Sequence, residues 1–307
     1  MVRILSLRPS GARARAAGVI TPDRRHRLQG SGLRGSFLTP SVLLGLALFG
    51  MPGCSFAPGR HVSAQHGAVI FSGPAQRFDP ADPQERLAAA DPLGFLKQCR
   101  RHYLEHISDY RCRFIRQERL HGILTAKEEM DIRFRENPFS VDVRWTRNAK
   151  LAKRVNYVAG RWAKNGREFA RIEPAGLLGL LFPRGVKRDI HAPDVRAAAR
   201  STIDRFGFKN SLDEIITNSE SAQGHPDFAL RFIGSGALDD RPCLIFEQWL
   251  PRDGPQGPYP SRLLVIHIDR EWLVPTGWFA YDDARKLLGS YVSIDVEFNV
   301  GLTDEDF

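Results

Sequence analysis

Apolar and polar side chains alternate along the C-terminal part of the chain. Residues 262–269 are rich in leucine and β-branched side chains, residues 278–281 resume the pattern after a Pro-Thr-Gly break, and residues 288–299 alternate Val, Ile and Phe with polar side chains. A period of two residues is typical of a strand with one buried face. Because turn-forming residues separate the three segments, they predict an antiparallel meander.

The same period of two recurs upstream of this meander. Phe139, Val141 and Trp145 fall on one face of a segment whose intervening residues are polar. This pattern predicts a half-buried strand in a sheet with one dry face. Turn signals such as Asn-Pro and Asn-Gly separate further predicted strands, which together lie at residues 110–120, 127–135, 139–147, 152–159, 161–172, 227–233 and 242–251.

Helical periodicity precedes the strands and also interrupts them. Residues 91–108 carry apolar side chains near helical spacing, with Asp91 as N-cap and Pro92 in the first turn. Residues 193–205 and 211–219 also indicate helices. Two runs of strands with helices grouped between them predict an α+β fold, in which one strongly curved antiparallel sheet wraps over a few helices.

The most apolar stretch downstream of residue 54 is PAGLLGLLFPRG, at residues 174–185. Placed between the two runs of strands, it fits a lid, a plug or a membrane-touching loop over the open face of the sheet. The alternative is a helix packed permanently in the core. We expect ligand-binding side chains from this stretch and from the dry sheet face: Leu177, Leu178, Leu180, Leu181, Phe182, Phe139, Val141 and Trp145.

Basic residues concentrate at the start of the chain. The formal net charge is +9, but residues 1–53 hold eight arginines and one acidic residue, whereas the remainder holds 36 basic and 34 acidic residues. The remainder lacks the basic surface that nucleic-acid binding requires, so we expect no nucleic-acid partner. Residues 39–50 are an uncharged apolar run too short to span a bilayer, and residues 1–53 are predicted to be a signal peptide with a basic n-region and an apolar h-region.

The apolar run is followed by Met51-Pro52-Gly53-Cys54, which resembles the lipobox of bacterial lipoproteins. This predicts cleavage before Cys54, acylation of that cysteine, and a lipoprotein anchored at a membrane on the periplasmic side of the cell envelope. The alternative is an ordinary signal peptide cut nearby. Residues 54–90 are predicted to be the lipobox cysteine and a flexible tether, and residues 91–307 a single domain.

Three further cysteines offer two interpretations. Cys99 lies in the predicted helix and Cys112 at the start of the next strand, which predicts a local disulfide in an oxidising compartment. Alternatively, Cys99, Cys112 and Cys243 are all buried as small hydrophobic residues. No Cys or His spacing matches a zinc site, so we expect no metal.

Motifs that carry catalysis do not occur in the sequence. Downstream of residue 53 it contains no GxSxG, HExxH, Walker loop or GxGxxG. Its paired acidic residues lie in a strand or at turns, where neighbouring carboxylates do not converge across a cleft. We expect a protein that is not an enzyme, with an unrecognised hydrolase as an alternative.

Several segments resemble one bacterial family, the domain-of-unknown-function family 1571. They are DYRCRFIRQERLHGILTAKEEMDIRFRENPFSVDVRW, YVAGRW, LVPTGWFAYD, LLGSY and FNVGLTDEDF, and the similarity covers residues 92–307. More distantly, the strand order resembles that of the lipoprotein carriers LolA and LolB. This resemblance implies an open β half-barrel whose concave apolar face holds the acyl chains of lipoproteins. The sequence shows no clear counterpart of the carriers' cavity arginine.

Two functions from different classes fit these observations. The first is a non-enzymatic, lipid-anchored envelope protein that binds a lipid, an acyl chain or a lipoprotein-like apolar ligand in a half-barrel cavity, driven by burial of apolar surface. The second is an envelope scaffold or sensor that contacts a protein partner and holds no small ligand.

Overall fold

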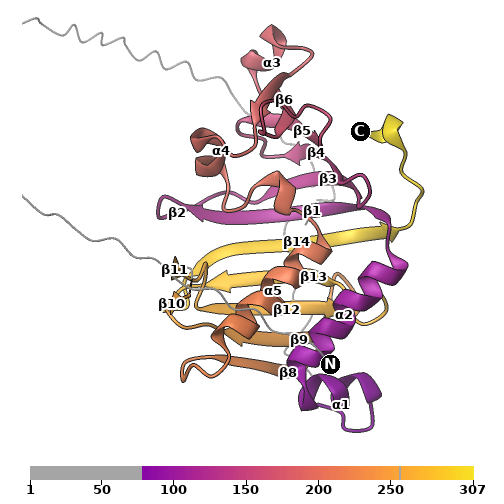
Figure 1. Cartoon of the computed structure of the whole chain (residues 1–307), viewed down its shortest axis with the longest axis vertical. Helices are drawn as coiled ribbons and strands as arrows, with labels where there is room; N and C mark the ends of the chain where they lie inside the picture. The colour runs from indigo at the N-terminus through magenta and orange to yellow at the C-terminus, as the bar shows by residue number, and fades with distance from the viewer. Residues whose placement is uncertain (1–77, 256) are drawn as a thin grey trace, which may run out of the picture. The chain divides into compact units, whose positions relative to one another are not determined.

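The computed structural model describes residues 78–307, apart from residue 256. In this part of the chain, one sheet carries helices on one of its faces (Figure 1). The predicted signal peptide at residues 1–53 and the predicted acylation site at Cys54 lie outside the described residues, and both stay predictions.

Most elements lie where the sequence pattern predicts them. The strands are β1 (Asp109–Leu120), β2 (Ile123–Leu124), β3 (Glu128–Arg135), β4 (Ser140–Arg147), β5 (Ala152–Val158), β6 (Phe169–Pro174), β7 (Val186–Asp189), β8 (Ala229–Leu238), β9 (Arg241–Trp249), β10 (Asp253–Gly254), β11 (Gly257–Pro258), β12 (Leu263–Asp269), β13 (Pro275–Tyr281) and β14 (Leu287–Phe298). The helices are α1 (Pro83–Ala90), α2 (Pro92–His106), α3 (Leu177–Leu181), α4 (Pro193–Ala198) and α5 (Phe208–Ala222), with short 3-10 turns η1 (Ile203–Arg205) and η2 (Asp304–Asp306).

One twelve-stranded sheet organises the fold. Its strand order is β7-β6-β5-β4-β3-β1-β14-β13-β12-β9-β8, with β2 paired to β1. Strands β7 and β8 end this order, so the sheet is not closed. The pairing of β1 with β14 joins the N-terminal run of strands to the C-terminal run. The predicted α+β fold, with one antiparallel sheet wrapped over a few helices, is confirmed (Figure 1).

Helices α2 and α5 cross the same face of the sheet (Figure 1). Their apolar sides pack on β9 and β12, where the ring of Phe95 stacks on that of Phe246 with centroids 5.6 Å apart and Ile266 is fully buried. Asp91 caps α2 by accepting a hydrogen bond from the backbone N of Gly94 at 2.8 Å, as the sequence predicts.

Helix α1 lies inside residues 54–90, so the prediction of a flexible tether is wrong for the end of that segment. Asp82 caps α1 by accepting hydrogen bonds from the backbone N of Gln84 at 2.8 Å and of Glu85 at 3.0 Å. Ala88 is buried in the core that α1 shares with α2. The composition does not distinguish this helix from a tether, because a proline and several alanines are common in both.

The predicted disulfide between Cys99 and Cys112 is not formed. Both thiols are free and buried, as is that of Cys243. Cys99 packs into the cluster of α1, α2 and α5, whereas Cys112 belongs to a separate cluster built on β1, β3 and β4. Burial raises the pKa of Cys112 to about 12, so its thiol stays protonated and unreactive. All three cysteines pack as small hydrophobic residues, which is the alternative interpretation.

A largely buried ionic cluster fastens α1 to the sheet. The side-chain Oγ of Ser235 donates to Glu85 Oε1 at 2.5 Å, Arg270 Nη1 donates to the same oxygen at 3.0 Å, and Arg270 also pairs with Asp82. Burial alone would raise the pKa of Glu85, but hydrogen bonds from the backbone N of Asp79, from Ser235 and from Arg270 outweigh it and hold that pKa below its usual value. Glu85 is therefore ionised in the folded protein.

We expect Arg270→Ala to lower the free energy of unfolding by about 1–3 kcal/mol, because it leaves a buried carboxylate without its cation. In the unsubstituted protein, the lowered pKa of Glu85 contributes stability above the usual carboxyl pKa of 4.5, and this is lost as the pH falls through the folded-state pKa. Urea unfolding followed by circular dichroism measures both effects. Arg86→Ala is the control, since Arg86 is exposed and donates only to backbone oxygens; equal losses in both variants would contradict the assignment.

Candidate ligand-binding site

A cavity of about 1000 Å³ lies between the sheet and the chain that follows β7. Successive residues of a strand point to opposite faces, so the strand side chains that line the cavity are alternate ones. On β1 they occupy even-numbered positions, and the neighbouring strands continue the same face. These side chains are Tyr110, Phe114, Arg116, Glu118, Met130, Ile132, Val143, Trp145 and Val155.

Residues 194–208, called here the covering segment, form most of the opposite wall. No side chain of α4 within it is buried. The first part of the covering segment is held at a few places. Arg188 Nη2 lies 2.7 Å from Asp194 Oδ1, the backbone N of Arg200 donates to Glu118 Oε1 at 3.4 Å, and Arg200 Nη2 donates to the carbonyl O of Pro260 at 2.7 Å. The end of the segment is anchored in the core by Phe208, which is buried. Residues 194–202 are therefore held more weakly than the sheet.

Aromatic rings line both walls of the cavity. The ring of Trp278 on β13 stacks on that of Tyr291 on β14, with centroids 5.4 Å apart and planes at 19°. The ring of Phe114 on β1 meets that of Phe206 on the covering segment edge to face, with centroids 5.4 Å apart. These contacts add directional packing to the apolar wall.

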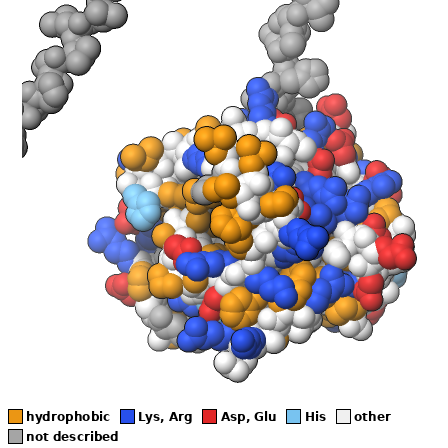
Figure 2. Space-filling view, turned by 90° about the horizontal axis from the view of Figure 1, so that it is seen from above, with side chains coloured by type: hydrophobic (Ala, Val, Ile, Leu, Met, Phe, Trp, Pro, Cys, Tyr) orange, Lys and Arg blue, Asp and Glu red, His pale blue; other side chains and the backbone are white. Residues whose placement is uncertain are grey.

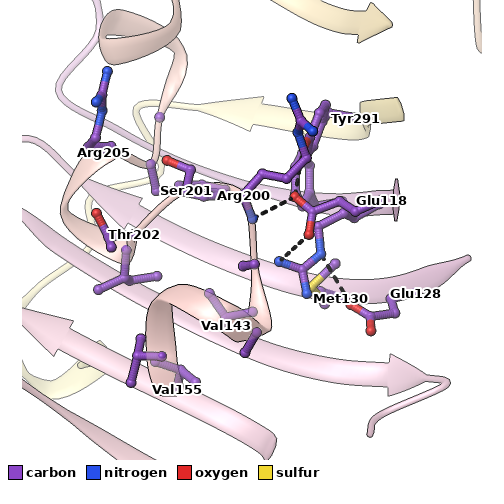
Figure 3. A pocket seen from close by; sticks show the side chains of 18 of the residues that line it. Glu118, Glu128, Met130, Val143, Val155, Arg200, Ser201, Thr202, Arg205 and Tyr291 are labelled. Carbon is purple, nitrogen blue, oxygen red and sulfur yellow. Dashed lines mark hydrogen bonds and ion pairs between the residues drawn. The ribbon is translucent and has the colours of Figure 1, made fainter. Parts of the chain in front are cut away.

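A cluster of charged side chains interrupts the apolar lining (Figure 3). Arg116 Nη2 lies 2.5 Å from Glu128 Oε2, and Arg116 Nη1 lies 3.8 Å from Glu118 Oε2. The hydroxyl of Tyr291 donates to Glu118 Oε1 at 2.8 Å, and Trp145 Nε1 donates to Glu128 Oε2 at 3.4 Å. The guanidinium of Arg116 thus pairs with two buried carboxylates, which also accept hydrogen bonds from side chains of the cavity wall.

The surroundings of this cluster fix two of its protonation states. Burial by itself would lower the pKa of Arg116, but the charges of Glu118 and Glu128 outweigh burial and raise it. Burial, reinforced by the charge of Glu118, raises the pKa of Tyr291 well above its usual value. The hydroxyl of Tyr291 therefore stays protonated and remains a hydrogen-bond donor.

Among the predicted ligand-binding residues with described side chains, only Trp145 lines the cavity. Val141 is buried in the adjacent core cluster, and Phe139 packs its ring edge to face on Phe134 with centroids 5.3 Å apart. Leu178 lies in α3, and its side chain is not described. The remaining members of the predicted lid point into solvent, with exposed fractions of 82%, 77%, 71% and 47% for Leu177, Leu180, Leu181 and Phe182.

The cavity is therefore covered by residues 194–208 and not by residues 177–182. The sequence does not mark the covering segment as a wall of the cavity, because its helical pattern resembles that of any surface helix. The apolar composition of residues 174–185 favours α3 instead, which lies between β6 and β7 at one edge of the sheet (Figure 1).

The sequence does not identify the charged cluster as a whole, although it contains a signal for part of it. Arg116 and Glu118 are in phase with Phe114 on β1, so they share its face. The partner Glu128 follows only from the register, which sets it opposite Arg116. The sequence offers no clear counterpart of the LolA-type cavity arginine, yet the structure places Arg116 in the cavity wall, already paired with carboxylates.

No group of three or more His, Cys, Asp or Glu side chains within residues 78–307, residue 256 aside, is arranged to hold a metal ion. No helix in the same part of the chain is long and apolar enough to cross a bilayer. The cavity offers apolar contact surface and, at one place, fixed hydrogen-bonding groups.

An open antiparallel sheet with a covered apolar cavity defines the architecture of this protein. The chain belongs to the family described as "Protein of unknown function (DUF1571)", whose model matches residues 107–307, in agreement with the sequence resemblance. No curated protein matches the sequence.

Solved structures show weaker likenesses. The chain is similar to the Pseudomonas aeruginosa MucA/MucB complex at 14% identity and a TM-score of 0.41, over 70% of this chain and 59% of that chain. It is similar to lipoprotein LppX of Mycobacterium tuberculosis at 12% identity and a TM-score of 0.36, over 69% and 98% of the two chains. A LolA superfamily protein of Nitrosomonas europaea matches at 8% identity and a TM-score of 0.27, over 70% and 96%.

The match covers 62% of the length of MucB itself, less than two thirds of that protein. The distant likeness to LolA-type proteins that the sequence predicts is thus among the matches. Because their TM-scores lie below 0.5, these likenesses support no inference about what this chain binds.

We expect Arg116→Met to lower the free energy of unfolding at neutral pH by about 3 kcal/mol, because it leaves Glu118 and Glu128 buried without their cation. Urea unfolding followed by circular dichroism measures this loss.

The control is Arg116→Met combined with Glu118→Gln and Glu128→Gln, which removes all three charges. We expect this triple variant to be more stable than Arg116→Met alone. An Arg116→Met variant as stable as the unsubstituted protein would show that Arg116 does not neutralise the two carboxylates.

Proposed function

We propose that the chain is a non-enzymatic binding protein of the cell envelope, which holds a lipid or an acyl chain in the cavity beneath residues 194–208. The observation that carries this proposal is the size and lining of the cavity. Its volume of about 1000 Å³ is at the upper end of the usual range for ligand pockets, and its walls are mostly apolar. Each buried methylene contributes about 0.8 kcal/mol, so an unbranched chain gains affinity along its length.

The charges around the cavity favour one orientation of the ligand. Arg116 is paired with Glu128 and lies near Glu118, so the cluster presents no uncompensated positive charge to an anionic headgroup. Lys150 and Arg200 line the cavity and are also exposed, which puts basic side chains at its mouth. The ligand therefore enters tail first and leaves its polar end near these two residues.

Entry requires one wall to move, and residues 194–202 of the covering segment are held by few contacts. The two hydrogen bonds of Arg200 contribute about 1 kcal/mol each, the exposed pair of Arg188 with Asp194 adds little, and α4 contributes no buried side chain. The sheet wall is held by continuous strand pairing, and Phe208 anchors the end of the covering segment in the core. Opening therefore displaces residues 194–202 and leaves the sheet unchanged.

The predicted acylation of Cys54 places this cavity at a membrane surface. Acylated there, the protein would hold its cavity at a distance set by the chain between Cys54 and α1. The periplasmic side of the cell envelope, predicted from the leader, is where such a protein would encounter lipids and lipoproteins.

Native mass spectrometry followed by organic extraction tests the proposal on protein expressed with its own leader in a bacterial envelope. The expected result is an acyl lipid in stoichiometric amount. Protein that is recovered empty and that also fails to bind cis-parinaric acid, a fluorescent acyl chain, would contradict it. Recovery of one stoichiometric protein partner without lipid would favour the scaffold alternative.

Val155→Trp should weaken binding of cis-parinaric acid about tenfold or more. Val155 is half-buried on the cavity wall, and an indole there occupies space equal to at least two methylenes of ligand. Fluorescence titration measures the affinity. Thermal unfolding followed by circular dichroism establishes that the variant is folded.

Two further variants keep this test decisive. Ala198→Trp fills the cavity from the covering segment and should give the same loss without touching the sheet. Leu104→Trp adds the same ring at a site on α2 that is 52% exposed, and it should leave binding unchanged. Equal affinity in all three variants would show that the acyl chain binds elsewhere.

A further inference from the structure

One end of the sheet carries a group of solvent-facing apolar side chains, called here the apolar tip. Its members are Leu151, Leu177, Leu180, Leu181 and Phe182. The first precedes β5 and the others belong to α3 or follow it, and the backbone N of Ala175 donates to the carbonyl O of Leu151 at 3.0 Å. Figure 2 looks onto this end of the molecule and shows hydrophobic side chains gathered there beside Lys and Arg.

The apolar tip projects and does not form a groove. Its four leucines each expose more than 70% of their surface: Leu151 at 72%, Leu177 at 82%, Leu180 at 77% and Leu181 at 71%. Residues 174–183, PAGLLGLLFP, contain no polar side chain. Large apolar patches on soluble proteins mark contact sites, and this one offers its occupant no side-chain hydrogen bond.

The charges next to the apolar tip are basic. Lys150 and Arg184 are exposed and adjoin it in sequence, and neither has a carboxylate partner among the described residues. The nearest acidic residue in sequence is Glu173, which Lys153 and Arg154 neutralise at 3.6 Å each. The apolar tip is thus flanked by positive charge with no uncompensated negative charge beside it.

We propose that the apolar tip inserts into the surface of a bilayer that contains anionic phospholipid. The leucines and Phe182 enter the boundary between headgroups and acyl chains, while Lys150 and Arg184 meet the phosphates. This contact is separate from the predicted anchor on Cys54 and does not depend on what the cavity binds.

A bilayer fits these observations better than a protein partner does. A protein interface carries about one hydrogen bond per 100–200 Å² and requires a complementary shape, whereas the apolar tip supplies neither polar side chains nor a hollow. Hydrocarbon requires only that the apolar side chains reach it. The flanking basic side chains match the charge of anionic headgroups.

The placement also has a geometric consequence. Leu151 belongs to the apolar tip and also lines the cavity. Its neighbour Lys150 lines the cavity too. Insertion of the apolar tip would therefore bring this part of the cavity rim to the membrane surface.

Vesicle co-sedimentation tests the proposal on the full chain carrying Cys54→Ser, which removes the predicted acylation site. The vesicles contain phosphatidylethanolamine with phosphatidylglycerol, or phosphatidylcholine alone. Combined substitution of Leu177→Asp, Leu180→Asp and Leu181→Asp should reduce binding about tenfold or more, since each leucine loses its burial in lipid. These side chains are exposed, so the fold should be unaffected.

Two matched variants separate the apolar contribution from the charged one. Leu104→Asp removes an exposed leucine elsewhere and should bind vesicles as the parent does. Lys150→Glu with Arg184→Glu should weaken binding only to the anionic vesicles, about fivefold per charge, and high salt should abolish that difference.

Three outcomes would overturn the proposal. One is a parent chain that does not sediment with either kind of vesicle. A second is an aspartate triple variant that binds as well as the parent. The third is a parent that forms a dimer in solution and loses it with the triple variant, which would assign the apolar tip to contact between two copies of this chain.

Discussion

The register of β1 between its two neighbours is the constraint on which the sheet and the cavity both depend. Residue Arg116 on β1 stands opposite Tyr291 of β14 on one side and opposite Glu128 of β3 on the other. The same pairing joins the two runs of strands into one sheet and gathers the charged cluster at one place in its wall. A slip of one residue would turn these side chains, together with Phe114, to the other face.

The strands and long helices could be predicted because each shows its period locally. The cap at Asp91 needs only neighbouring residues, and the structure agrees with it. The alternation predicted along β4 is only partly present, because Ser140 and Asp142 are buried together with Val141. The cavity wall could not be predicted in this way, because Glu128 reaches Arg116 through a register that the hairpin geometry sets. Helix α1 could not be predicted for a related reason, because its docking depends on Arg270, which lies far away in the sequence.

Helix α3 marks the limit of reasoning from hydropathy. A run of leucines predicts that the side chains leave water, but it does not say whether they enter a protein core, cover a ligand or enter lipid. The predicted lid corresponds to the second possibility, that the leucines cover a ligand. In the structure the cavity is covered by residues 194–208, where polar and apolar side chains are mixed, and Leu177, Leu180 and Leu181 are left outside.

The two edges of the open sheet are protected in different ways. Strand β7 is four residues long and carries Lys187 and Arg188, which discourages another strand from pairing with it. Strand β8 is ten residues long and has α1 packed beside it, fastened through Ser235. A chain that lost α1 would leave this strand without that neighbour, and an edge strand of this length is the kind to which a second molecule can add a strand.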